Sequence, residues 1–195
     1  MEGWVADGEL EPTTDMVQGP FYPVIKPEDQ DADLTVIKGR PNRAEGQLLY
    51  VKGRVINLRG EPLPGTRVEI WQANTHGRYT HPNDNNPAPL DPNFEGYGVQ
   101  TTDAQGNYRF KTIKPGAYPT PMGWMRAPHI HFCVTSRKTQ LITQIYFAGE
   151  PLDAADLLLK SSLYADSLIK TLSPPEPGME PEALVANFDI VLGET

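Results

Sequence analysis

The fold is indicated most clearly by residues 48–73, LLYVKGRVINLRGEPLPGTRVEIWQA. Two apolar runs in this stretch, both rich in β-branched residues, are typical of strands, and turn residues at 57–60 and 62–65 separate them. Short strands joined by turns of this kind are a common start of a β-sandwich domain. The stretch therefore predicts an all-β protein with a β-sandwich core.

The pattern continues along the chain. Further strands are predicted at NYRFKTI (107–113), HIHFCVTS (129–136), LITQIYFAG (141–149) and ALVANFDIVL (183–192). Residues 75–98 have almost no periodicity but many Asn, Asp and Pro, which predicts a long irregular loop. Apolar residues at roughly helical spacing over 153–172 predict one helical segment near the C-terminus.

Length and composition set limits on the kind of protein. A chain of 195 residues that is 38% hydrophobic predicts a single domain over residues 1–195, with an N-terminal arm at 1–18. The net charge of −8 and the scattered basic residues argue against nucleic acid as a partner. No apolar run approaches the length of a membrane span, and mean hydropathy is −0.45. The polar start and the lone Cys133 lead us to expect a cytoplasmic protein.

His129 and His131 are the sharpest local signal for a functional site. Residues two apart in a strand point to the same side of the sheet, so both imidazoles can bind one metal ion. Such histidines also occur as ordinary core or surface residues, but the chain has only four, and two lie in this apolar strand. We therefore favour a metal site that needs further ligands from elsewhere.

Tyr79, in GRYTHP, and Tyr118, in KPGAYP, are candidates for those ligands. Both lie in loop segments bounded by Gly or Pro, where a phenol oxygen could be directed inward. Taken alone, each is better interpreted as an ordinary packed or surface tyrosine. A tyrosinate oxygen is hard and anionic, which suits iron(III), and a bound cation promotes ionisation of a phenol whose ordinary pKa is about 10.

Six motifs then occur together and in order: VEIWQAN, GRYTHP, LDPNF, TIKPGAYP, RAPHIHF and LITQIYF. With them, residues 19–192 resemble the intradiol ring-cleavage dioxygenase family, and most closely its iron-binding protocatechuate-type subunits. The resemblance implies a β-sandwich enzyme that cleaves a catechol-type ring between its two hydroxylated carbons. The reaction would consume O2 and give a muconate-type dicarboxylate.

The resemblance also implies roles for individual residues. A mononuclear non-haem iron(III) cofactor would be bound by Tyr79, Tyr118, His129 and His131. Tyr118 would be the ligand that substrate displaces, and Arg126 would stabilise negative charge developing on the substrate. Gln144 would lie beside the iron and substrate. Without the resemblance, Arg126 is better interpreted as part of a surface ion pair. His76 and His81 are not expected to be ligands.

The substrate pocket is predicted from weaker signals. Gly19 and Pro20, in GPFYP, resemble the family's pocket-shaping N-terminal segment, although the same residues could form a plain turn. Trp71 would line the pocket, with core packing as an equally good explanation. Thr120 stands where the protocatechuate-type enzyme has a tryptophan. A protocatechuate-like substrate is favoured, and catechol, hydroxyquinol and pyrogallol are the alternatives.

The short N-terminal arm contrasts with the helical dimerisation region of the catechol and hydroxyquinol members of the family. The protocatechuate-type layout therefore fits better. Three assemblies stay open for action on a small catechol and O2: the chain alone, a homo-oligomer, or a complex with a second dioxygenase subunit. Two other interpretations are a metal-free, transthyretin-like binding module and a non-catalytic partner subunit. The four candidate donors argue against both, because neither needs them.

Overall fold

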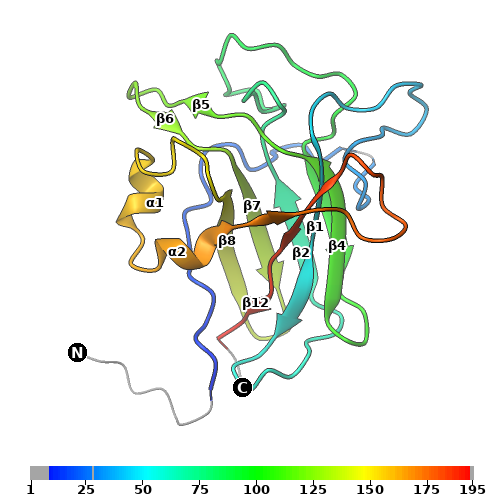
Figure 1. Ribbon diagram of the computed structural model, residues 1–195, viewed down its shortest axis with the longest axis vertical. Helices are drawn as coiled ribbons and strands as arrows, with labels where there is room; N and C mark the ends of the chain where they lie inside the picture. The colour runs from blue at the N-terminus through cyan, green and yellow to red at the C-terminus, as the bar shows by residue number, and fades with distance from the viewer. Residues whose placement is uncertain (1–8, 28, 194–195) are drawn as a thin grey trace.

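The computed structural model describes residues 9–27 and 29–193, so part of the predicted N-terminal arm, residues 1–8, lies outside the described residues. One sheet has the strand order β3-β2-β7-β8-β9, and in the other β1 pairs with β11 and β12 on one side and with β4 on the other (Figure 1). The elements are β1 (Leu48–Ile56), β2 (Arg67–Trp71), β3 (Tyr97–Thr101), β4 (Asn107–Ile113), β5 (Tyr118–Pro119), β6 (Met125–Arg126), β7 (His129–Thr135), β8 (Gln140–Phe147), α1 (Leu157–Ser161), α2 (Ala165–Leu168), β9 (Ile169–Lys170), β10 (Leu172–Ser173), β11 (Leu184–Asn187) and β12 (Ile190–Val191).

The core lies between the two sheets, which confirms the predicted β-sandwich. Strand alternation explains it: Ile130, Phe132 and Val134 of β7 are fully buried in a cluster that also contains Val51 of β1 and Phe110 of β4. The intervening residues of β7 therefore point to the other side of their sheet. That side carries a second, aromatic cluster, so β7 is buried on both faces.

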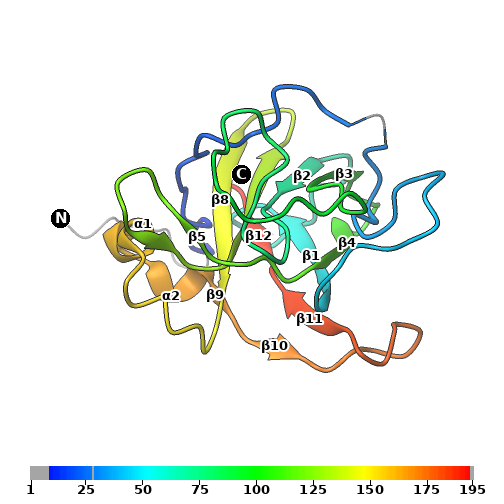
Figure 2. The ribbon, with the colours of Figure 1, turned by 90° about the horizontal axis from the view of Figure 1, so that it is seen from above.

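The C-terminal region confirms the predicted helical segment but corrects its extent, and it also corrects the closing strand. In place of one helix over 153–172 there are two short helices, α1 and α2, followed at once by β9, which pairs with β8 (Figure 2). Leu157 and Tyr164, which suggested a buried helical stripe, are exposed, whereas Leu159 and Leu168 are buried. The predicted closing strand is divided into β11 and β12, which pair with different parts of β1.

The predicted long loop is confirmed over residues 75–96, which contain turns but neither helix nor strand. Its last residues were assigned wrongly, because β3 begins at Tyr97 and pairs with β2. Residues 9–18 run along the sandwich: Thr13 bonds to Val191, and Met16 to Ile142. Within the described part of the chain, no helix has the length and apolar character needed to cross a bilayer.

Candidate functional site

Four donor atoms from distant parts of the chain meet on the outer side of the β3-β2-β7-β8-β9 sheet. Tyr79 Oη lies 3.1 Å from His131 Nε2, which lies 3.1 Å from His129 Nε2, which lies 3.4 Å from Tyr118 Oη. All four side chains are at least 94% buried. The structure thus brings together the four residues that the sequence singled out as metal ligands.

Strand geometry places the two histidines. Both lie on β7, two residues apart, on the side that faces away from the sandwich core. His131 pairs with Trp71 of β2 on one side and with Gln144 of β8 on the other. The Trp71 indole stacks on the His131 ring, with centroids 4.7 Å apart and planes 9° from parallel, which fixes the orientation of this imidazole.

Tyr79 and Tyr118 lie on two loop segments that are in contact at Gly77. Gly77 has a φ of 78°, and a Cβ there would collide with the carbonyl of Ala117, so glycine permits the 75–96 loop to lie against the segment that carries Tyr118. The Tyr79 N–H donates to the Asp84 carboxylate at 2.7 Å, which holds the loop at this residue. The Tyr79 and Tyr118 rings pack edge to face, 5.4 Å apart.

Burial controls the charge of this cluster. It lowers the pKa of His129 and of His131 well below the ordinary value, with the Arg126 charge as a further cause, so both imidazoles are neutral. Burial also raises the pKa of both tyrosines above the ordinary phenol value, and it raises that of Tyr79 well above it. His129 Nδ1 lies 2.6 Å from the Ala127 carbonyl and donates to it, so Nε2 presents its lone pair to the cluster, as a metal ligand must.

Arg126 is buried, so its interpretation as a surface residue is wrong. Its Nε donates to Asp156 at 2.9 Å, and its Nη2 donates to Gln144 and to Tyr146 at 2.8 Å each. Its Nη1 reaches Tyr118 Oη at 3.5 Å. Burial lowers the pKa of Arg126, but Tyr118, Tyr146 and the Asp156 carboxylate more than offset this and raise it above the ordinary value. A permanent cation is therefore fixed beside the four donors.

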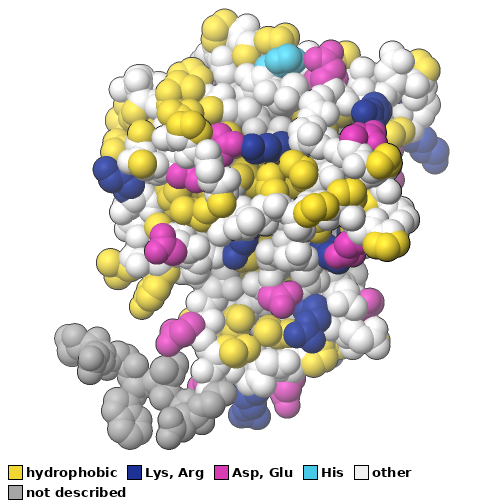
Figure 3. Space-filling view, in the orientation of Figure 1, with side chains coloured by type: hydrophobic (Ala, Val, Ile, Leu, Met, Phe, Trp, Pro, Cys, Tyr) yellow, Lys and Arg dark blue, Asp and Glu magenta, His cyan; other side chains and the backbone are white. Residues whose placement is uncertain are grey.

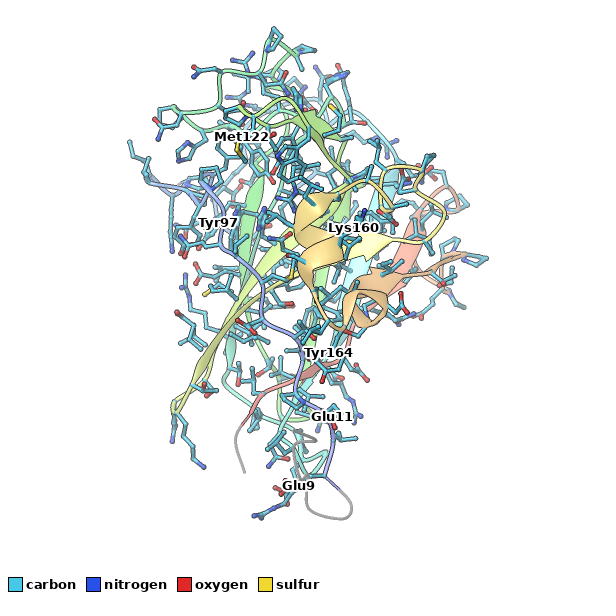
Figure 4. All side chains as sticks on the ribbon, turned by 90° about the vertical axis from the view of Figure 1, so that its left-hand side faces the viewer. Glu9, Glu11, Tyr97, Met122, Lys160 and Tyr164 are labelled. Atoms are coloured by element: carbon cyan, nitrogen blue, oxygen red, sulfur yellow. The ribbon has the colours of Figure 1, made fainter. Side chains whose placement is uncertain are left out.

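The sequence reasoning missed Asp156 and Tyr146. Asp156 is fully buried and caps α1, accepting from the N–H groups of Leu158 and Leu159 while its second oxygen holds Arg126. An Asp directly before LLLK is a typical helix-capping signal and could have been recognised. Its pairing with Arg126, 30 residues earlier, could not be predicted from the local sequence. Tyr146 is two residues after Gln144 on β8, so strand alternation alone could have placed the two on one face. Figure 4 shows α1, marked by Lys160, below the β5–β6 turn marked by Met122.

The N-terminal segment closes the site from the other side. Gly19 lies against His131, since a Cβ at Gly19 would be 3.4 Å from the imidazole. The Phe21 ring packs against the Tyr79 ring, with centroids 4.7 Å apart. Pro20 is exposed. Glu69 of β2 anchors the segment, because its buried carboxylate accepts from Tyr22 at 2.9 Å and from Lys26 at 2.8 Å. Figure 4 shows Tyr97, which also bonds to Glu69, beside this segment.

The remaining predicted residues lie at the margin or outside. Thr120 is in the β5–β6 turn, where its hydroxyl donates to the Trp124 carbonyl at 2.9 Å. His76 pairs with Glu45 at 3.0 Å, and His81 accepts from the Asn83 N–H. Among the described residues, no group of three or more His, Cys, Asp and Glu side chains could hold a metal ion. A metal site here therefore depends on the tyrosines.

Comparison with known proteins agrees with this geometry. A sequence model of the dioxygenase family matches residues 17–194. The protocatechuate 3,4-dioxygenase beta chain of Burkholderia cepacia is 43% identical over 191 residues, which cover 93% of this chain and 80% of the relative. The hydroxyquinol 1,2-dioxygenase of Corynebacterium glutamicum is 31% identical over 83% of this chain, which spans only 54% of that relative.

Solved structures give the same picture. The dioxygenase domain of a carbohydrate-binding fusion protein from Streptomyces sp. SirexAA-E has a TM-score of 0.72 at 28% identity, covering 95% of this chain and all of that domain. Catechol 1,2-dioxygenase from Acinetobacter sp. ADP1 also has a TM-score of 0.72, at 27% identity, over 94% of this chain and 64% of that one. From the motifs, the fold and these relatives together, the chain belongs to the intradiol ring-cleavage dioxygenase family of enzymes.

Proposed function

We propose that this chain uses mononuclear non-haem iron(III) to cleave a protocatechuate-like catechol between its hydroxylated carbons with O2, giving a muconate-type dicarboxylate. The observation that carries the proposal is the buried line of four donor atoms, with successive spacings of 3.1, 3.1 and 3.4 Å. Ligand atoms bound about 2.0–2.2 Å from one ion lie about 2.8–3.6 Å apart, so the spacing fits a shared metal.

The chemistry of the donors also fits iron(III). Tyr79 and Tyr118 would contribute two anionic oxygens, and His129 and His131 two neutral nitrogens, a combination that suits a hard trivalent cation. Burial alone disfavours the tyrosinates, so the cation would have to supply the driving force for their ionisation. Bound iron(III) would hold both catechol oxygens and draw electron density from the ring, which makes the ring reactive toward O2.

The two tyrosines are proposed to behave differently. Tyr79 is held through its backbone by Asp84 and covered by Phe21, so we assign it as the ligand that stays bound. Tyr118 lies next to the Arg126 guanidinium. A tyrosinate displaced at Tyr118 would remain beside this cation, and there it would take a proton from the incoming catechol.

Arg126 is proposed to stabilise the negative charge that builds up on the substrate during ring opening. Its guanidinium is already oriented by Asp156, Gln144 and Tyr146, so little reorganisation is needed when that charge develops. Gln144 also donates to the Val17 carbonyl at 2.7 Å, which ties this network to the N-terminal segment. We assign Gln144 to positioning Arg126.

Substrate specificity is proposed to depend on the rim. Gly19 lies against His131, the neighbouring Pro20 is exposed, and the buried Trp71 indole stacks on the His131 ring, so we assign these three residues to shaping the substrate pocket. Thr120 is a small side chain bound to its own turn, so this position adds little bulk to the pocket. The protocatechuate preference rests on the relative named as a protocatechuate 3,4-dioxygenase beta chain.

Metal analysis and oxygen uptake together test the proposal. Purified protein is expected to contain one iron per chain and to be wine-red from tyrosinate-to-iron charge transfer. In a panel of protocatechuate, catechol, hydroxyquinol and pyrogallol, protocatechuate should give the highest kcat/KM, with a ring-opened product spectrum. Colourless protein that stays inactive after loading with iron would refute the assignment.

The Burkholderia cepacia relative is named as a beta chain, so a second subunit is one of the assemblies to test for this protein. Light scattering of the purified chain, combined with the uptake assay, separates a homo-oligomer that is active alone from a chain that becomes active only when a second dioxygenase subunit is added.

A further inference from the structure

A cavity of about 710 Å³ lies between residues 27–40 and the end of the 75–96 loop, and none of the four donor residues lines it. Its walls include Ile37, Leu90 and Phe94, with Lys38 and Arg40 exposed near its rim. Hydrophobic and charged side chains are intermixed on the face of the molecule that Figure 3 shows. The volume falls in the range of small-molecule sites.

The carboxyl group of Glu95 makes this cavity unusual. Glu95 lines it, its side chain is 8% exposed, and neither carboxyl oxygen has a hydrogen-bond partner among residues 9–27 and 29–193. The other buried carboxylates with assigned roles are all bonded: Glu69 to Tyr22 and Asp156 to Arg126. A buried carboxyl without a partner costs free energy that a ligand with hydrogen-bond donors would recover.

The charge around Glu95 indicates which ligand would fit. Burial, followed by the carboxylates of Asp29, Asp31 and Asp33, raises its pKa to about 8, and no cation is among these causes. Arg40 on the rim is bound to the Pro92 carbonyl. The charged residues that line the cavity besides Glu95 are Asp29, Asp91, Lys38 and Arg40, so with Glu95 the acidic groups outnumber the basic ones around it. This favours a cation at the carboxyl and an apolar group against the walls.

We propose that this cavity binds a small organic ammonium ion, with its charged nitrogen at Glu95 and its apolar body along Leu90 and Phe94. The ammonium group would donate charge-assisted hydrogen bonds to the carboxylate. The apolar body would leave water for a wall that is already formed. Thr80, which directly follows the candidate ligand Tyr79, also lines the cavity, but the inference does not depend on iron binding or on the proposed reaction.

Calorimetric titration with phenethylammonium, compared with the neutral 2-phenylethanol, tests this site. Wild-type protein should bind the ammonium ion with one-to-one stoichiometry, and Glu95→Gln should weaken this binding by at least about tenfold, since a hydrogen bond to a charged partner is lost. The control Glu182→Gln removes an exposed carboxylate and should leave binding unchanged. The alcohol should bind more weakly, and equally to all three proteins.

A second test does not rely on the folding of the Glu95 variant. Leu90→Trp, at a half-exposed position on the cavity wall, should weaken ammonium binding by filling the space. At neutral pH the wild-type titration should also release protons, seen as heats that differ between buffers, because binding ionises Glu95. The proposal is overturned by absence of saturable binding up to millimolar probe, by equal affinity in Glu95→Gln, or by alcohol binding as tight as ammonium binding.

Discussion

Among single residues, Arg126 has the environment that bears most directly on function, because its buried cation lies beside the candidate ligand Tyr118. An arginine three residues before a histidine would ordinarily be exposed, yet here its guanidinium is buried against one carboxylate and three other polar side chains. Each of these contacts orients the charge, and none neutralises it except Asp156. This arrangement is expected of a group that stabilises transient negative charge.

Replacing Arg126 should therefore impair turnover more than substrate binding. Arg126→Ala is expected to lower kcat by well over tenfold, which is more than about 1.4 kcal/mol of barrier. Arg126→Lys keeps a charge but loses the fork that bonds Asp156 and Gln144 together, so it should recover only part of the rate. Steady-state oxygen uptake measures both, with the exposed Arg137→Ala as control. Near-native turnover in a folded Arg126→Ala protein would remove the residue from the mechanism.

Tyr118→Phe should retain most of the iron but slow the deprotonation of the incoming catechol, because the displaceable base is lost. Tyr79→Phe should lose more iron, since Tyr79 is assigned as the permanent ligand. Iron content and stopped-flow absorbance on mixing with substrate distinguish the two variants. The control is Tyr50→Phe. Tyr50 lies on β1 of the other sheet, and the substitution removes a hydroxyl that donates to Glu180. Unchanged substrate-binding rates in Tyr118→Phe would argue against its role.

At the scale of elements, β7 supplies one side of the sandwich core and the nitrogen donors of the site from the same seven residues. Strand periodicity makes this division unavoidable once one set of alternate residues faces the core. The loops then have to bring the oxygen donors to the opposite side. The contact between the 75–96 loop and the segment before Tyr118 is the element-level feature on which the site depends.

That contact can be tested by paired glycine substitutions. Gly77→Ala places a Cβ against the Ala117 carbonyl in addition to the backbone strain at positive φ. Gly149→Ala has similar strain, with a φ of 88°, but apart from its chain neighbours no atom of the described residues lies within 4 Å of its Cβ. Gly149→Ala should cost about 1 kcal/mol of unfolding free energy. Gly77→Ala should cost clearly more and lower the iron content. Urea unfolding and metal analysis measure both, and equal behaviour would mean that the loops do not need this close approach.

At the scale of the whole molecule, the buried imidazoles link stability to pH. The unfolded chain binds protons at His129 and His131 near an ordinary pKa of about 6.5, whereas the folded metal-free protein does so only at much lower pH. Below about 6.5 the unfolded state therefore holds more protons, so stability is full above this pH and falls as the pH is lowered.

Metal-free protein should accordingly lose up to about 1.4 kcal/mol of unfolding free energy per pH unit for each of these histidines below pH 6.5. Urea unfolding from pH 7 to pH 5 measures the slope. The double variant His129→Asn/His131→Asn should show a shallower slope, and the control His76→Asn, at an exposed ion pair, should keep that of the wild type. Identical slopes in all three proteins would contradict the burial argument.

The family assignment also decides between the interpretations left open by the sequence. Membership in a family of intradiol enzymes, with 43% identity to one of its subunits, favours catalysis over a metal-free binding module. Retention of all four donors in one buried cluster agrees with this, since a module or an inactive subunit gains nothing from polar side chains placed in that way.

Alternation and turn chemistry act over a few neighbouring residues, so they were enough to predict β1, β2, β4, β7 and β8, most of the long loop and the shared face of His129 and His131. The remaining features come from contacts between distant segments, which the folded protein reveals. It brought Tyr79 to His131 across 52 positions and Arg126 to Asp156 across 30, and it replaced one helix by two short ones ahead of β9. These outcomes depend on which segments pack together, and local pattern does not specify packing between segments that are distant in the chain.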